Sequence, residues 1–354
     1  MKLLQSNHKA TLFALGAAAL YAINIPLSKL LLQRVDETML AALLYLGAGL
    51  GMLVTGLIQR QVARERPQAA PLTRKELPYT VAMVLLDILA PILLMLGISR
   101  TSPANVSLLN NFEIVATSLI ALVVFKEVIS KRLWLAIGLV TLASAILSLE
   151  PGGTLGFDTG SLLVLGACLC WGFENNCTRN ISNKSSQEIV IIKGCFSGLG
   201  SFLIALLLGE RLPPLPFAGA ALLLGFVAYG LSINFYILAQ KDLGAAKTSA
   251  YYSIAPFLGV AFSLVLLGER PGLRFYVALA IMALSAVLMA RDTVKLQHSH
   301  EHQHTHTHPH RHGDLVHTHP HTHTHSHLHV HRGDPGDHSH PHGDLPDHQH
   351  SHSA

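Results

Sequence analysis

Two stretches of the chain, "VVFKEVISKRLWLAIGLVTLASAILS" (123–148) and "VLLGERPGLRFYVALAIMALSAVLMA" (265–290), follow one pattern. Each is the end of an apolar segment, a short charged turn and a second apolar segment. Another pair, "LGAAALYAINIPLSK" (15–29) and "LGACLCWGFENNCTR" (165–179), aligns at nearly the same spacing. The longer loop at 59–76 accounts for the small difference between the two spacings, so the sequence indicates an internal duplication.

The composition is that of a membrane protein. Half of the 354 residues are hydrophobic and only 13% are charged, whereas about a quarter of the residues of soluble proteins are charged. Apolar segments of about 20 residues, the length that crosses a bilayer, recur along the chain. They predict ten spanning helices, near 11–32, 38–58, 77–98, 103–125, 132–149, 159–178, 187–208, 216–238, 244–267 and 273–291.

The duplication then has a consequence for the architecture. Five helices are an odd number, so the second copy crosses the membrane in the opposite direction from the first, as in alternating-access transporters. We expect an all-α membrane protein made of two inverted five-helix repeats, 1–150 and 151–296, followed by a disordered tail, 297–354.

The Lys and Arg residues predict the orientation. They concentrate in the loops on the side of the N-terminus, such as 59–76, and cytoplasmic loops carry the excess of positive charge. The sequence therefore predicts a multi-pass protein of a bacterial-type inner (plasma) membrane, with both termini in the cytoplasm.

One helix pair carries a family resemblance. It is "TSPANVSLLNNFEIVATSLIALVVFKEVISKRLWLAIGLVTLASAIL" with its second copy "LGAAKTSAYYSIAPFLGVAFSLVLLGERPGLRFYVALAIMALSAVLM". The chain resembles the EamA branch of the drug/metabolite transporter superfamily over roughly 8–292. The second copy keeps Pro256 and Gly268-Glu269, whereas the first has Ile114 and Lys126 at these places. With its histidine-rich tail, the chain is similar to nickel and cobalt resistance permeases, a resemblance that implies secondary transport.

Polar residues within the apolar segments are the candidates for a transport path, because an ionisable group in a spanning helix costs about 3 kcal/mol and usually faces a cavity or a partner. Asp87 precedes Pro91 by one turn, which suits a proton carrier. Lys193 is either a structural partner of an acid or the switching charge itself. The predicted path residues are Asn24, Asp87, Asn110, Glu113, Glu174 and Lys193.

Two of these candidates have an alternative interpretation. Cys170, Glu174 and Cys177 share one helix face, where they are either successive metal ligands or, for the thiols, small packing residues. Asn110 and Glu113 also share a face. Their carboxylate and amide either bind cargo or make a polar contact between helices.

The tail holds all but one of the 23 histidines. Neutral imidazole is a common ligand of nickel, cobalt and zinc, and few apolar residues accompany it, which predicts disorder. The expected metal ligands are His300, His302, His304, His306, His308, His310, His321, His323, His325, His327 and His329.

These observations leave three functional hypotheses. The first is an exporter of divalent nickel or cobalt in exchange for protons, the second an exporter of an organic metabolite or amino acid with a metal-sensing tail, and the third a membrane-tethered metal buffer or sensor.

An enzyme is not expected, because the sequence holds no nucleophile constellation and no phosphate loop. No cofactor is required, since nickel, cobalt or zinc would be cargo or bound by the tail. The expected partners are lipid, divalent metal ions and protons, without nucleic acid, and a homodimer stays open.

Overall fold

The computed structural model describes residues 2–62, 73–125, 131–149, 158–181, 184–312 and 315–330. The chain divides into two compact units, Met1–Val294 and Lys295–Ala354. We call them the membrane unit and the histidine unit. The predicted repeat boundary at 150 lies outside the described residues, as does the end of the tail from 331 onward.

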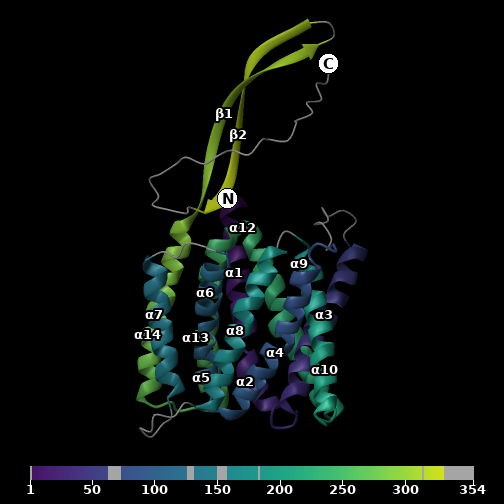
Figure 1. Cartoon of the computed structure of the whole chain (residues 1–354), viewed down its shortest axis with the longest axis vertical. Coiled ribbons are helices and arrows are strands. Elements are labelled where there is room, and N and C mark those ends of the chain that lie inside the picture. Colours follow the sequence, from purple (N-terminus) through teal and green to yellow (C-terminus); the bar gives the residue numbers. More distant parts are fainter. Residues whose placement is uncertain are drawn as a thin grey trace. The chain divides into compact units, whose positions relative to one another are not determined.

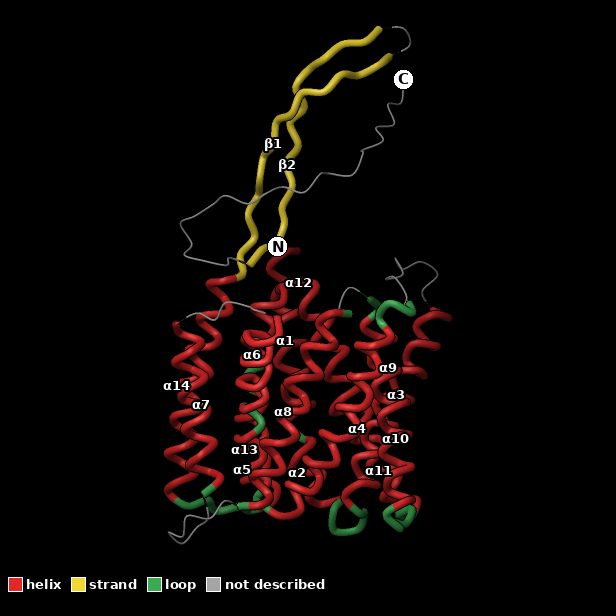
Figure 2. The backbone as a smooth tube through the Cα atoms, in the orientation of Figure 1, coloured by secondary structure: helices red, strands yellow, loops and turns green. Residues whose placement is uncertain are grey.

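The membrane unit is a bundle of helices that lie side by side (Figures 1 and 2). Two of its segments are π-helical turns, labelled η. The elements are α1 (Lys2–Ala22), α2 (Asn24–Leu31), α3 (Glu37–Val62), α4 (Leu77–Arg100), α5 (Pro103–Leu109), α6 (Phe112–Phe125), α7 (Lys131–Ser148), α8 (Thr159–Asn180), α9 (Ser186–Ile192), η1 (Lys193–Ser197), α10 (Gly198–Leu207), α11 (Leu215–Gly225), η2 (Phe226–Leu231), α12 (Ser232–Tyr252), α13 (Ala255–Leu267) and α14 (Leu273–Leu296).

Seven helical segments in the described part of the chain are long and apolar enough to cross a membrane. Helix α8 is long enough but not apolar enough, because polar residues such as Glu174 and Asn175 interrupt it. Helix α13 is apolar but shorter. Ten spans in two inverted repeats therefore stay a prediction. The seven segments are Lys9–Leu31, Glu37–Ile58, Leu77–Arg100, Pro103–Val124, Lys131–Ser148, Gln187–Leu207 and Leu215–Ala239.

The chain turns back between the two segments predicted at 216–238 and 244–267. The span that begins at Leu215 ends at Ala239. The rings of Tyr236 and Tyr252 lie 5.1 Å apart, whereas residues so far apart along a straight helix would be separated by about 24 Å, so α12 is not straight. The next break, at Ser253 and Ile254, comes just before Pro256, which has no N–H group to donate to the Tyr252 carbonyl.

Helix breaks occur at corresponding places of the two copies. Asn110 and Asn111 separate α5 from α6, and Ser253 and Ile254 separate α12 from α13. Such breaks release backbone groups from helical hydrogen bonding, and they are tolerated in membranes where the groups are buried in protein or line a cavity. The Asn111 side-chain amide donates to the Leu108 carbonyl at 3.0 Å, which replaces one lost hydrogen bond.

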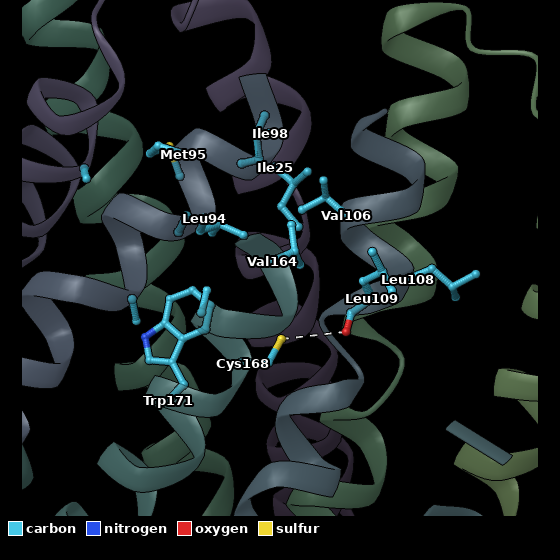
Figure 3. Close-up of a cluster of buried hydrophobic side chains, with 14 of the residues drawn as sticks. Ile25, Leu94, Met95, Ile98, Val106, Leu108, Leu109, Val164, Cys168 and Trp171 are labelled. Atoms are coloured by element: carbon cyan, nitrogen blue, oxygen red, sulfur yellow. Dashed lines mark hydrogen bonds between the residues drawn. The ribbon is translucent and has the colours of Figure 1, made fainter. Parts of the chain in front are cut away.

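The core of the membrane unit is apolar and closely packed. Figure 3 shows Leu94, Val106 and Val164 meeting between α4, α5 and α8. Cys168 belongs to this core, where its thiol donates to the Leu109 carbonyl at 3.7 Å. Glycine allows the closest helix approach, because a Cβ atom at Gly225 would lie 1.9 Å from the Leu44 carbonyl oxygen.

The histidine unit contains a hairpin where disorder was expected. Strands β1 (Gln297–His312) and β2 (Leu315–Val330) pair antiparallel, with His312 opposite Leu315. Disorder was expected because apolar residues are scarce in this segment. The strict alternation of histidine with small polar residues also matches the two-residue period of a strand, and ladder hydrogen bonds do not depend on apolar burial.

Candidate transport site

A cavity of about 830 Å³ lies inside the membrane unit. Its wall includes residues at both helix breaks, among them Asn110, Asn111, Ser253 and Pro256. It also carries two carboxylates and a lysine, Glu113, Glu174 and Lys193. Six aromatic side chains also line the cavity: Tyr21, Tyr45, Trp171, Tyr229, Tyr236 and Tyr252.

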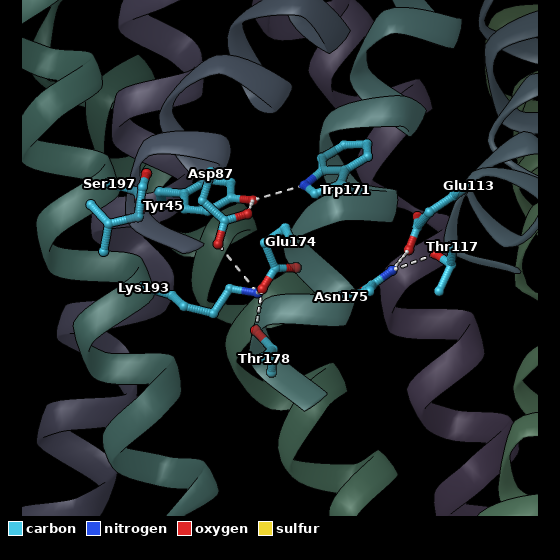
Figure 4. A network of polar contacts seen from close by, with 11 residues as sticks. Tyr45, Asp87, Glu113, Thr117, Trp171, Glu174, Asn175, Thr178, Lys193 and Ser197 are labelled. Atoms are coloured by element: carbon cyan, nitrogen blue, oxygen red, sulfur yellow. Dashed lines mark hydrogen bonds and ion pairs between the residues drawn. The ribbon is translucent and has the colours of Figure 1, made fainter. Parts of the chain in front are cut away.

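Helix α8 divides the polar groups of the cavity into two sets (Figure 4). Glu174 and Asn175 are consecutive residues, so their side chains leave the helix about 100° apart. Glu174 contacts Lys193 of η1, whereas Asn175 contacts Glu113 of α6. We call these sets the lysine cluster and the amide cluster.

The lysine cluster joins three ionisable residues of three helical segments. The Lys193 ammonium lies 2.8 Å from Glu174 Oε1 and 3.2 Å from Asp87 Oδ2. Asp87 is fully buried and Glu174 is 2% exposed. Tyr45 donates its hydroxyl to Asp87 Oδ1 at 3.1 Å, and Thr178 donates to Glu174. One cation therefore serves two buried carboxylates.

The amide cluster has a different composition. Asn175 Nδ2 donates to Glu113 Oε1 at 2.7 Å and also lies 3.2 Å from the Thr117 hydroxyl oxygen. Glu113 forms no ion pair with any side chain that the structure describes. Its carboxylate thus lies on the cavity wall with a neutral hydrogen-bond partner.

The aromatic side chains form a continuous array around these clusters. The Tyr229 ring lies 5.5 Å from the Tyr45 ring and 6.0 Å from the Tyr21 ring, measured between centroids. Tyr252 meets Tyr236 edge to face at 5.1 Å. Trp171 Nε1 donates to the Tyr45 hydroxyl at 3.3 Å, which ties the array to the lysine cluster.

The structure brings most of the predicted path residues to one place. Asp87, Glu174 and Lys193 meet in the lysine cluster, and Asn110 and Glu113 lie on the cavity wall. Asn24 is buried and reaches the cavity indirectly, since it donates to the Tyr229 hydroxyl at 2.8 Å. What these residues do in transport stays a prediction.

Tyr45, which donates to Asp87, was missed, and Asn175, which donates to Glu113, was noted beside Glu174 but not included among the predicted path residues. No periodicity marks Tyr45 as polar in function, because tyrosine is also a normal packing residue. The sequence did contain one signal for the aromatic array. Tyr21 and Trp171 occupy equivalent positions of the two copies, and both line the cavity.

No group of three histidine, cysteine, aspartate or glutamate side chains is arranged to hold a metal ion in the part of the chain whose side chains are described. Cys170 and Cys177 are not among the lining residues of the cavity, so the packing interpretation suits them better than that of successive metal ligands. The predicted histidine ligands all fall on β1 or β2, where only the backbone is described.

Two further acids, outside the cavity, accept hydrogen bonds from backbone N–H groups at the starts of helices. Glu269, in the loop between α13 and α14, accepts a hydrogen bond from the Ala104 N–H at the start of α5, at 3.0 Å. Burial raises the pKa of Glu269, while this hydrogen bond and the charge of Lys29 act against the rise. Similarly, Glu210 accepts from the Met39 N–H at the start of α3, at 2.7 Å.

The EamA-like transporter family matches residues 8–149 of the chain and again residues 158–291. The chain belongs to this family. It is therefore a multi-pass membrane protein of a transporter family, and its family is not one of enzymes.

Similar proteins agree with this assignment. An uncharacterized transporter of Methanothermobacter thermautotrophicus is 25% identical over 268 residues, which are 72% of this chain and 78% of that protein. The uncharacterized inner membrane transporter YedA of Escherichia coli strain K12 is 26% identical over 159 residues, 44% of this chain and 51% of YedA. A crystal structure with 17% sequence identity shares the fold, with a TM-score of 0.59, 81% of this chain covered and 97% of that chain.

Proposed function

We propose that this EamA-like protein exports a small organic cation across the inner membrane in exchange for protons. The observation that supports this proposal is the cavity of about 830 Å³, in which aromatic rings surround more acids than bases. The cavity has the volume of a typical small-molecule site. Both termini would lie in the cytoplasm, in keeping with the Lys and Arg bias and with the inner-membrane location of the similar YedA.

The charges of the site favour a cation. Asp87, Glu113 and Glu174 supply three carboxylates, and Lys193 supplies one ammonium group. When all four are ionised, two negative charges remain without a counter-charge in a poorly hydrated environment. Such charges must be neutralised by protons or by a bound cation. Proton and cargo then compete for the same carboxylates, which is the physical basis of antiport.

The aromatic array favours an organic cation over a bare metal ion. Ring faces attract ammonium-type cations by about 0.5–2 kcal/mol each, and Tyr21, Trp171 and Tyr252 all line the cavity near Glu113 or Glu174. A divalent metal needs several close ligands, and the described side chains contain no such group of three. We therefore place the organic cargo first.

Export of nickel or cobalt is the second candidate. It is favoured by the two excess negative charges, which a divalent ion would neutralise, and by the histidine-rich segment that would collect the ion in the cytoplasm. Glu113, Glu174 and Asp87 would then carry the metal directly. Under either candidate we expect no cofactor.

Transport by the purified chain in liposomes distinguishes these candidates. With a pH gradient imposed, uptake of a fluorescent organic cation such as ethidium is compared with uptake of Ni²⁺ and Co²⁺. We expect gradient-driven uptake of ethidium and its loss in Glu113→Gln, whereas the control Glu188→Gln, an acid that does not line the cavity, retains it. Uptake of Ni²⁺ or Co²⁺ without ethidium would overturn the organic cargo in favour of the metal.

A third outcome tests transport itself. If the intact chain binds Ni²⁺ but moves neither cation under any gradient, the membrane-tethered metal buffer is the better description. Acidification provides a further check on the exchange. Because protons compete with the cargo for Glu113, the affinity for ethidium should fall as the pH is lowered.

A further inference from the structure

The hairpin of the histidine unit aligns its histidines across the two strands. In β1 the histidines occupy even-numbered positions, and in β2 they occupy odd-numbered ones. The antiparallel register pairs even with odd residues, so histidine stands opposite histidine at seven consecutive same-face positions. These are the pairs 298/329, 300/327, 302/325, 304/323, 306/321, 308/319 and 310/317.

This register is specific. Residues directly opposite each other in an antiparallel pair belong to the same face, and the face alternates along the strand. The seven pairs therefore fall on one face, while the other face receives pairs such as Thr305 with Thr322. A shift of the register by one residue would place every histidine opposite a non-histidine residue.

The hairpin lacks the usual sources of stability. An isolated two-stranded hairpin is at best marginally stable in water. Apart from a few residues such as Val316 and Leu328, both strands lack apolar side chains that could be buried. Below about pH 6.5 the imidazoles become charged, and like charges directly opposite each other destabilise a strand pair. A ligand that binds facing neutral imidazoles would supply the missing stabilisation.

We propose that the histidine face of this hairpin is a row of divalent transition-metal sites, each built from two successive facing pairs. Opposite Cα atoms lie about 4.5–5.5 Å apart, and same-face neighbours along a strand lie about 7 Å apart. Two successive pairs thus place four imidazole-bearing positions around one point, and four nitrogen ligands suit Zn²⁺, Ni²⁺ or Cu²⁺. Seven pairs accommodate about three such sites.

The proposal makes the position of a histidine matter more than the number of histidines. The alternating variant, His300→Gln, His304→Gln and His308→Gln, removes three histidines and interrupts every second pair, so no two intact pairs remain adjacent. The matched terminal variant, His308→Gln, His310→Gln and His317→Gln, also removes three histidines. It leaves five contiguous pairs, enough for two complete sites.

Metal binding to the full-length chain in detergent tests this design. Tightly bound Zn²⁺ and Ni²⁺ are counted after equilibrium dialysis at pH 7.5. We expect about three ions for the unaltered chain, about two for the terminal variant and none for the alternating variant. Equal counts for the two variants would overturn the proposal, because they would show that histidine number alone decides binding.

Hydrogen exchange provides the second readout. The amides of 297–330 should become protected when Zn²⁺ is added to the unaltered chain or the terminal variant, but not when it is added to the alternating variant. Protection that is the same with and without metal would also overturn the proposal. Ethidium transport is measured separately, so failure of the metal sites is distinguishable from failure of the proposed function.

Discussion

The buried acids on the two sides of α8 have different partners. On one side, Glu174 shares Lys193 with Asp87, so a resident cation compensates one of the two negative charges. On the other side, Glu113 receives a hydrogen bond from the neutral amide of Asn175. A lysine compensates the charge of a carboxylate. An amide orients a carboxylate without neutralising it, so the negative charge can still attract a bound cation. The lysine cluster thus suits a structural or switching role, and the amide cluster suits binding of a cationic cargo.

Removing the lysine should have the largest effect. The variant Lys193→Met leaves Asp87 and Glu174 buried without a counter-charge, which costs about 3–5 kcal/mol of unfolding free energy. Denaturation of the purified chain in detergent measures this loss. The triple variant Asp87→Asn, Glu174→Gln, Lys193→Met carries no charge at these positions and should recover most of it. A single variant as stable as the unaltered chain would contradict the importance of the lysine cluster.

Making the second side resemble the first should abolish cargo binding. In Asn175→Lys, an ammonium group next to Glu113 takes the place of the cargo, and the cavity offers room for the longer side chain. We expect a loss of ethidium affinity of at least about tenfold, or 1.4 kcal/mol, with the fold retained. The control Asn175→Gln keeps the amide and should bind. Unchanged affinity in the lysine variant would mean that Glu113 does not contact the cargo.

The hydroxyl of Tyr45 should have a smaller effect. The variant Tyr45→Phe deletes the donor to Asp87 and the acceptor for Trp171, which costs about 1 kcal/mol of stability. Ethidium affinity should change little, because the amide cluster is untouched. A greater loss of affinity than of stability would show that the two clusters act as one site.

The smallest effect is expected at Glu269, outside the spanning helices. Its pKa is raised in the folded protein, chiefly by burial. Its contribution to stability is therefore fully present below the unfolded pKa and is lost as the pH rises through the folded pKa. Glu269→Gln removes this dependence but keeps an acceptor for the Ala104 N–H. Between pH 4 and pH 7 the melting temperature should shift in favour of the variant, by the equivalent of at most about 0.5 kcal/mol.

Much of the candidate site was predictable one helix at a time. Asp87, Glu113, Glu174 and Lys193 were identified because an ionisable residue in an apolar segment requires a compensating environment. The partners were not predictable. Asp87 and Lys193 are far apart in sequence, and helical periodicity assigns a residue to a face but does not say which other helix meets that face.

A local rule also failed where two such rules disagreed. The histidine segment looked disordered by composition, whereas its alternation matched a strand, and β1 and β2 form. Here the rule that concerned the backbone prevailed over the rule that concerned side-chain polarity.

The sequence by itself determined that this chain crosses a membrane, that it is duplicated, and that its apolar helices carry acids, because hydropathy, repetition and the cost of burying charge are local properties. Only the tertiary structure decided that one lysine serves two of the acids while an amide holds the third, and that aromatic rings from both copies enclose them. The physical reason is that neutralisation and cavity shape depend on distances between helices, which no single segment of the chain encodes.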